Sequence, residues 1–265
     1  MGTVIDFNNP ETFPKELIPN QEFTEKILDK LNKNDIELWQ IKSKLNDYCI
    51  EDTDIVRNFI KNNQDAEFIL FHCARILDKN DYLKNGIRIC GGRGSEEEIR
   101  LRSILKDIGV PHSETEKIFI EIYKLWDRDG DLRTQSVHFF IEEKEIYKDD
   151  QLNYFAINVG GEILRWAMEL VDCNLYRKQP YNQLWKIGTP SVIKFKSKLK
   201  DIVGFKQQLL AAEIVKYYII TNSLNQSDYD FSFTGMTKGS VSPENIIGIF
   251  EIKDYEKMQE KYLDN

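Results

Sequence analysis

The run Glu67-Phe68-Ile69-Leu70-Phe71-His72-Cys73-Ala74 decides how the rest of this chain can fold. It is short, largely apolar and bounded by polar residues, which is typical of a strand buried on both faces. The backbone groups of such a strand need partner strands, and its two faces need covering layers. We therefore expect the core of the protein to be built around this run.

The sequence before this run predicts helices. Apolar residues recur at helical spacing over 23–31 and 38–45, and a third short helix is expected over 53–61. Three prolines make the stretch before these helices an irregular arm. No Gly- or Ser-rich linker follows. Residues 1–65 are therefore expected to form a helical N-terminal extension that packs on a domain of residues 66–265.

The segment after the run predicts a short helix and a second strand. Asp78 is a typical N-cap, and Gly86 is expected to end the helix as a left-handed C-cap. Residues 87–90 are expected to form the strand, before the loop Gly91-Gly92-Arg93-Gly94. Three glutamates that follow this loop would repel an anion, so a plain turn is predicted there.

Three further helices are expected. Ser95 with Glu98, and Ser113 with Glu116, have the spacing of capping boxes and predict the starts of the first two. The third is expected over about 150–171, where apolar residues mark one helix face.

The later part of the chain predicts strands. Alternating apolar residues indicate strands at 137–141, 191–196, 215–221, 229–234 and 246–252. Helices come first and most strands later, without regular βαβ alternation. The fold class is therefore expected to be α+β and not a doubly wound sheet.

Composition excludes several classes of protein. The 265 residues, 41% hydrophobic and 12% aromatic, are enough for a real core. No apolar run approaches the roughly 20 residues of a membrane span, and the N-terminus lacks a secretory pattern, so no membrane association is expected. A net charge of −8 gives no global attraction to nucleic acid. Four scattered cysteines predict neither a disulfide framework nor a zinc site and fit a cytoplasmic protein.

Three common kinds of site are not predicted. The acidic segment 127–131 has its glycine fourth and not sixth, which fails the spacing of a calcium loop. His72, His112 and His138 form no metal-binding pair, so no metal is expected. No GxSxG sequence indicates a serine hydrolase.

His72 belongs to a set of motifs. The string Leu70-Phe71-His72-Cys73-Ala74-Arg75, followed by Tyr82-Leu83-Lys84-Asn85-Gly86-Ile87, resembles the opening motif of the ADP-ribosyltransferase superfamily. Ser136-Val137-His138-Phe139-Phe140-Ile141 looks like the family's second conserved strand, and Gly160-Gly161-Glu162 follows it. The stretch 239–249 resembles the segment that leads into the last strand of such domains.

This resemblance covers about residues 66–255 and implies a fold and an activity. The fold is an ADP-ribosyltransferase-like split antiparallel β-sheet behind the helical extension. The activity is transfer of ADP-ribose from NAD to a macromolecular acceptor, which is DNA, RNA or protein, with nucleic acid slightly favoured. Resemblance to the toxin branch implies a bacterial toxin or anti-phage effector, for which a cognate antitoxin is the natural partner.

The resemblance also implies roles for the residues of the opening motif. In the family the first-strand histidine, here His72, donates to the adenosine ribose. The backbone of the next residues, here Cys73 and Ala74, pairs with the nicotinamide carboxamide. Arg75 is expected to reach the pyrophosphate, because a guanidinium suits that target.

The remaining roles are assigned to later residues. Phe140 and Tyr154 are the candidates for stacking on the nicotinamide ring. Gly160 and Gly161 are expected to keep side-chain bulk away from a ligand. Cleavage of NAD develops oxocarbenium character on the ribose, which a nearby carboxylate stabilises. Glu162 is the candidate for this carboxylate.

The sequence departs from the family at this carboxylate. Most relatives carry a glutamate at the start of a late strand, but residues 228–234 contain none. Glu162 is the expected substitute, and Asp228 or Asp230 is the alternative. Without a catalytic carboxylate the chain would be an inactive module that binds NAD, ADP-ribose or a protein partner. A third hypothesis is an antitoxin-like interaction protein that uses helices within 21–63.

Overall fold

The chain forms two compact units. The computed structural model describes residues 3–31, 45, 48–130, 134–145, 160–223, 231 and 233–252. One unit contains Met1–Ile69 and Ser197–Gly235, and the other contains Leu70–Lys196 and Met236–Asn265. The extension predicted over 1–65 therefore shares a unit with residues 197–235, which the sequence assigned to the catalytic domain.

The described strands form one six-stranded sheet in the order β5-β3-β2-β4-β6, with β1 paired to β2. The strands are β1 (Val4–Asp6), β2 (Glu67–Ile76), β3 (His138–Phe140), β4 (Thr189–Lys198), β5 (Thr234–Met236) and β6 (Ile246–Glu251). β3 pairs antiparallel with β2, and β6 with β4, whereas β1 runs parallel to β2. Helices and this sheet together confirm the α+β class. The sheet is single in the described residues, whereas the resemblance implies a split one.

The apolar run over 67–74 lies in β2, as predicted. The interior of this strand is buried, with Leu70 fully inaccessible and Phe71 1% exposed. Phe71 lies opposite Phe140 of β3 in register. The strands predicted at 137–141, 191–196 and 246–252 are confirmed as β3, β4 and β6 with small shifts at their ends.

Two strand predictions are wrong or only partly realised. Residues 87–90 form no strand, because only Ile87 makes a bridge, to Val241. Of the strand predicted at 229–234, Thr234 alone belongs to β5, and residues 229, 230 and 232 lie outside the described part of the chain.

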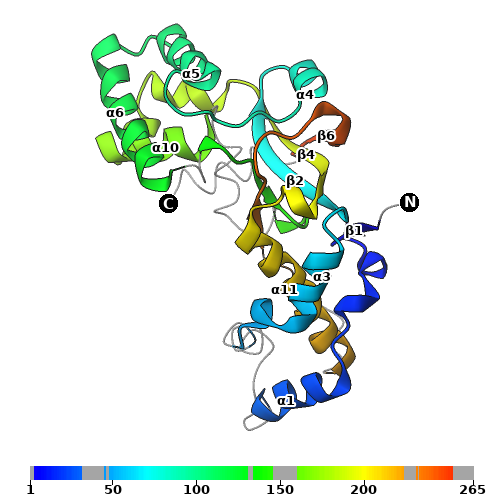
Figure 1. The fold of residues 1–265 in the computed structure, drawn as a ribbon. Coiled ribbons are helices and arrows are strands. Elements are labelled where there is room, and N and C mark those ends of the chain that lie inside the picture. Colours follow the sequence, from blue (N-terminus) through cyan, green and yellow to red (C-terminus); the bar gives the residue numbers. More distant parts are fainter. Residues whose placement is uncertain are drawn as a thin grey trace. The chain divides into compact units, whose positions relative to one another are not determined.

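The strand predicted at 215–221 is wrong, because these residues belong to the 20-residue helix α11 (Gly204–Ser223). Val215 and Ile219 are fully buried in it. A helix that buries several of its sides loses the polar face that marks an amphipathic helix, and its β-branched residues then imitate a strand. α11 packs on α3 (Asp54–Asn62), as Figure 1 shows.

The first unit also contains α1 (Gln21–Leu31), which confirms the first predicted helix, and α3 confirms the third. The prediction at 38–45 falls mainly outside the described residues. Short 3-10 turns in the two units are Pro10–Thr12, Lys15–Leu17, Ile50–Asp52, Leu175–Arg177, Tyr181–Trp185, Leu199–Asp201 and Pro243–Asn245.

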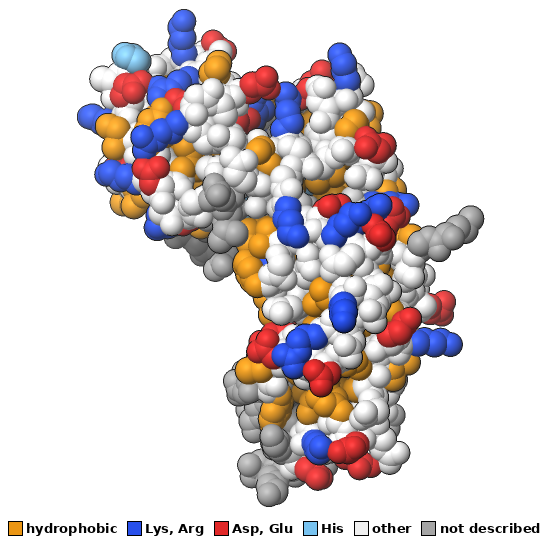
Figure 2. All heavy atoms as spheres, viewed as in Figure 1, with side chains coloured by type: hydrophobic (Ala, Val, Ile, Leu, Met, Phe, Trp, Pro, Cys, Tyr) orange, Lys and Arg blue, Asp and Glu red, His pale blue; other side chains and the backbone are white. Residues whose placement is uncertain are grey.

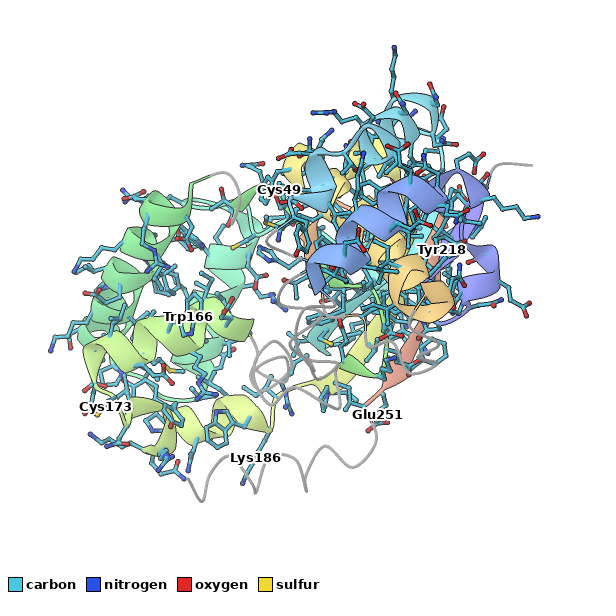
Figure 3. All side chains as sticks on the ribbon, turned by 90° about the horizontal axis from the view of Figure 1, so that it is seen from below. Cys49, Trp166, Cys173, Lys186, Tyr218 and Glu251 are labelled. Atoms are coloured by element: carbon cyan, nitrogen blue, oxygen red, sulfur yellow. The ribbon has the colours of Figure 1, made fainter. Side chains whose placement is uncertain are left out.

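The helices of the second unit are α4 (Lys79–Asn85), α5 (Glu96–Asp107), α6 (His112–Asp129) and α10 (Gly161–Val171). α10 packs along α6 (Figure 1). Of the helix predicted over 150–171, residues 150–159 lie outside the described part. Figure 3 shows Trp166 on α10 and Cys173 just beyond its end. All four cysteines are free thiols, and no described helix has the length and apolarity to cross a membrane.

Of the three predicted N-caps, two are confirmed and one is wrong. The carboxylate of Asp78 accepts a hydrogen bond from the backbone N–H of Asn80, and Ser95 Oγ accepts one from the backbone N–H of Glu98. Ser113 is not a cap, because α6 already begins at His112 after Pro111. A proline directly before a helix start supplies a fixed φ, which competes with a side-chain cap as the start signal.

Gly86 provides the first test of this fold. It ends α4 with a φ of +77°, as a C-cap requires, although its ψ of −163° is not left-handed helical. A Cβ at this position would lie 1.9 Å from the carbonyl oxygen of Val241. Gly86→Ala should therefore destabilise the protein by backbone strain and also by a clash with backbone.

The matched control is Gly94→Ala. Gly94 has a φ of +74°, and a Cβ added there would meet no heavy atom within 4 Å, so only strain of about 1–2 kcal/mol is expected. Urea unfolding should give a clearly larger loss for Gly86→Ala. Equal losses in the two variants would contradict the close approach of Val241.

Candidate active site

A pocket of about 810 Å³ opens in the second unit. This volume lies in the range of sites that bind small molecules and cofactors. Its lining comes from the end of β2, from α4 and α5, from the segment before β3, and from the start of α10. Seven of the nine residues predicted for the site line it: His72, Cys73, Ala74, Arg75, Gly160, Gly161 and Glu162.

The alternation of β2 divides the opening motif between two faces of the sheet. Successive side chains of a strand point to opposite faces. His72 and Ala74 share one face and are half-buried, whereas Cys73 and Arg75 point to the other and are buried. Burial raises the pKa of the Cys73 thiol far above its usual range, which leaves it a protonated, unreactive group.

His72 is held by a hydrogen bond to β3. Its Nδ1 lies 2.8 Å from the backbone carbonyl oxygen of His138. A carbonyl only accepts, so Nδ1 carries the proton in this arrangement. Burial lowers the pKa of His72, and the bond to His138 offsets part of that effect. The neutral ring then offers Nε2 as an acceptor, whereas the resemblance implies a histidine that donates.

Arg75 lines the pocket and also holds the turn before β4. Its side chain is 7% exposed, with Nε donating to the carbonyl of Ile187 at 2.8 Å and Nη2 to that of Gly188 at 3.2 Å. The alternation of β2 directs this side chain away from the face of His72. Arg75 therefore anchors the turn before β4, and its contact with a pyrophosphate stays a prediction.

Packing by itself already requires a glycine at position 160, which also lines the pocket. Its φ is +94°, and a Cβ there would lie 2.7 Å from Cδ2 of Leu101 and 3.0 Å from Cβ of Leu164. Gly161 also has a positive φ, of +57°. The two glycines form the turn that starts α10 and so fix the position of the next residue, Glu162.

Glu162 lies half-buried in the first turn of α10 and lines the pocket. The positive end of the helix dipole favours a carboxylate at this position. Further along the same helix, Arg165 Nε lies 2.8 Å from Glu169.

The two aromatic candidates are not part of the described lining. Phe140 is 4% exposed and packs opposite Phe71, outside the pocket. Tyr154 lies outside the described residues, as do Asp228 and Asp230. The aromatic side chains in the lining are Tyr82 and Trp126.

Sequence reasoning missed both aromatic residues of the lining for different reasons. Tyr82 belongs to the quoted string that ends in Ile87, so its proximity to the motif was a usable signal. Burial raises its pKa, which keeps the phenol neutral. Trp126 lies on the apolar stripe of α6, where no pattern separates a pocket residue from a core residue.

Charged groups in the pocket are largely paired. The described lining carries five carboxylates and three guanidinium groups: Asp78, Asp81, Glu96, Glu97, Glu162, and Arg75, Arg88, Arg100. Arg88 bridges Asp81 and Glu96, with Nη1 3.0 Å from Glu96. Arg100 forms a two-pronged pair with Glu97 at 2.8 and 2.5 Å.

Comparisons with family models, with curated proteins and with solved structures find no match to this chain. The family resemblance seen in the sequence therefore stays a prediction. Any function must be inferred from the geometry and chemistry of this pocket.

The lowered pKa of His72 predicts a pH dependence of stability. Above its ordinary pKa of 6.5 the ring is neutral in both the folded and the unfolded chain. As the pH falls below 6.5 the unfolded chain binds the proton first, so folding stability decreases until the folded pKa is passed. Urea unfolding at pH 7.5 and 5.5 should show a smaller loss in His72→Gln than in the wild type.

The control for this experiment is His112→Gln, because the side chain of His112 is 89% exposed. It should keep the pH dependence of the wild type. If His72→Gln loses as much stability on acidification as the wild type does, His72 is not a buried neutral ring.

Proposed function

We propose that this chain is an NAD-dependent ADP-ribosyltransferase, which cleaves the nicotinamide–ribose bond and transfers ADP-ribose to a macromolecular acceptor. The observation that carries the proposal is that His72 and Glu162, ninety residues apart in sequence, line one pocket of about 810 Å³. A neutral acceptor nitrogen and a half-buried carboxylate are what recognition of a ribose and stabilisation of its cation require. The toxin role, the antitoxin partner and the cytoplasmic location stay predictions of the resemblance.

Glu162 has the chemistry for the bond-breaking step. Departure of nicotinamide leaves positive charge on the ribose, as in glycoside hydrolysis. A carboxylate fixed at the start of a helix stabilises that charge without having to reorganise, and a partly water-excluded pocket strengthens the effect. Nicotinamide leaves with the electron pair of the broken bond, so no separate acid is required.

His72 has the chemistry for recognition of a ribose. With Nδ1–H donated to His138, its Nε2 accepts a hydrogen bond from a sugar hydroxyl. The same nitrogen and a phosphate oxygen are both hydrogen-bond acceptors, so they would repel each other. A cofactor that carries a phosphate on this hydroxyl should therefore bind less well than NAD.

Arg88 and Arg100, and not Arg75, bind the pyrophosphate of NAD in this proposal. Both guanidinium groups line the pocket, and their side chains are 50% and 37% exposed. Each guanidinium has five N–H donors, so an arginine already paired with a carboxylate keeps donors for a phosphate. Tyr82 and Trp126 are the aromatic residues of the lining that can pack against a planar base or ring.

The alternative function is a module that binds NAD, ADP-ribose or a protein partner without turnover. Two observations favour it. Residues 228–234 contain no glutamate, and at least three of the five carboxylates in the described lining form ion pairs with arginine. In this case the pocket would bind nucleotide, but Glu162 would contribute nothing to chemistry.

Glu162→Gln separates the two functions. The substitution removes the charge at nearly constant volume, so nicotinamide release from NAD should fall by about 10²-fold or more if the carboxylate stabilises the transition state. The matched control is Glu169→Gln on the same helix, which should keep wild-type turnover. Chromatographic measurement of nicotinamide gives the rate.

Two results would contradict the enzymatic function. Full turnover in Glu162→Gln would remove Glu162 from the catalytic step. NAD binding without nicotinamide release in the wild type would establish the binding module instead.

A further inference from the structure

The charges around the pocket bear on the class of acceptor. The sequence left nucleic acid and protein open, with a slight preference for nucleic acid, and four arginines cluster after the opening motif: Arg88, Arg93, Arg100 and Arg102. A protein that binds a nucleic acid needs cations that can neutralise phosphates and release their counterions. The partners of these four arginines therefore decide what the surface can bind.

Three of these arginines are paired in or beside the pocket. Arg88 and Arg100 hold the carboxylates described above. Arg93 lies with Nη2 2.6 Å from Asp127 of α6, and its guanidinium packs 4.6 Å from the ring centre of Tyr123. Each charge is thus compensated by an acidic side chain within hydrogen-bond distance.

Arg102 is the most firmly held of the four. Its Nε lies 2.8 Å from Glu98 and its Nη1 2.6 Å from Glu116, and its Nη2 donates to the hydroxyl of Tyr123 at 2.9 Å. The guanidinium also lies 3.9 Å from the ring centre of Phe119. This network joins α5 to α6, so Arg102 has a structural role and is not directed at a ligand.

The described side chains form no continuous basic stripe on the face that Figure 2 shows. Over the part of that face formed by α4, α5 and α6, blue and red side chains alternate. The described lining has more carboxylates than guanidinium groups, and the chain has a net charge of −8. If Arg88 and Arg100 bind the pyrophosphate, the described lining leaves no further exposed arginine for phosphates of an acceptor.

Exposed aliphatic side chains accompany these paired charges. Leu77 lines the pocket and is 44% exposed, Leu83 on α4 is 48% exposed, and Ile99 on α5 is 64% exposed. Surfaces that bind proteins bury apolar side chains at the centre of the contact and keep polar groups at its rim. Surfaces that bind nucleic acid are more polar and strongly positive.

Resting on the proposed function, we propose that the acceptor is a protein and not a nucleic acid. In the reaction the bond between C1′ of the ribose and the nicotinamide nitrogen breaks, and nicotinamide keeps its electron pair. A nucleophilic side-chain atom of the acceptor bonds to C1′ and loses one proton to water. The exposed aliphatic residues of α4 and α5 contact the acceptor, while Arg88 and Arg100 are engaged by carboxylates and by the pyrophosphate of NAD, so the described lining offers no further exposed arginine to a polyanion.

The direct test supplies labelled NAD and the full chain with three separate probes: nuclease-treated total cell protein, purified DNA and purified RNA. Label in the protein pool alone is expected. Label in DNA or RNA, with none in protein, overturns the inference but leaves the transferase intact. Failure of the proposed function looks different, because nicotinamide is then not released with any probe or in water; that result overturns the inference as well.

A second experiment tests whether the pairing of Arg88 and Arg100 with carboxylates is what keeps nucleic acid from binding. The double variant Glu96→Gln/Glu97→Gln removes the carboxylate partner of Arg100 and one of the two partners of Arg88, which keeps Asp81. The control Glu244→Gln/Glu251→Gln removes the same charge at two exposed positions outside the lining. Binding of a fluorescent single-stranded oligonucleotide at about 0.1 M salt should rise about tenfold in the first variant only. Tight binding by the wild type, or equal binding by both variants, overturns the inference.

The double variant Leu83→Asp/Ile99→Asp tests whether the exposed aliphatic residues of α4 and α5 contact the protein acceptor. Neither residue belongs to the described lining of the pocket, so nicotinamide release into water should stay at the wild-type rate. Transfer of label to the protein pool should fall at least about fivefold, because burying an unpaired carboxylate in an interface is unfavourable. Unchanged transfer to protein would show that α4 and α5 do not contact the acceptor.

Discussion

The pairing of β2 with β3 is the constraint on which the pocket depends. β2 is an interior strand, so its backbone groups must be satisfied by neighbours on both sides, and β3 supplies one of them. The register that sets Phe71 opposite Phe140 also brings the carbonyl of His138 to Nδ1 of His72. That one bond fixes which ring nitrogen carries the proton and therefore what the pocket offers to a ligand.

The alternation of β2 decides which residues of the opening motif share a face of the sheet. A strand has two faces, and a motif read as a linear string does not show which residues share one. His72 and Ala74 face the same side, whereas Arg75 points away and holds the carbonyls of Ile187 and Gly188. Phe140 is committed to the core opposite Phe71. In the proposed function the pyrophosphate is bound by Arg88, between α4 and α5, and Arg100 of α5, and the planar rings by Tyr82 of α4 and Trp126 of α6.

Local signals made much of the fold predictable from sequence. β2 and β4 are apolar runs with clear ends, and Asp78 and Ser95 cap helices through their own side chains. α11 was predicted in part as a strand, because a helix buried on several sides has no polar face to reveal its period. Such an error arises from tertiary burial, which no short window of sequence contains.

The candidate site was predictable in its membership but less so in its chemistry. The motifs named seven residues that share one pocket, which follows from the order of segments in the chain. The tautomer of His72, the packing role of Gly160 against Leu101, and the pairing of the arginines depend on contacts between distant segments. The slight preference for a nucleic-acid acceptor rests on the resemblance of the opening motif, which carries no information on the carboxylate partners of Arg88, Arg93, Arg100 and Arg102.

A crystal structure of the full chain grown with NAD tests the central claim most directly. We expect NAD in the pocket of the second unit, with a ribose hydroxyl on Nε2 of His72 and the nicotinamide ribose beside the carboxylate of Glu162. NAD bound away from these two residues, or a pocket without NAD at saturating concentration, would contradict it.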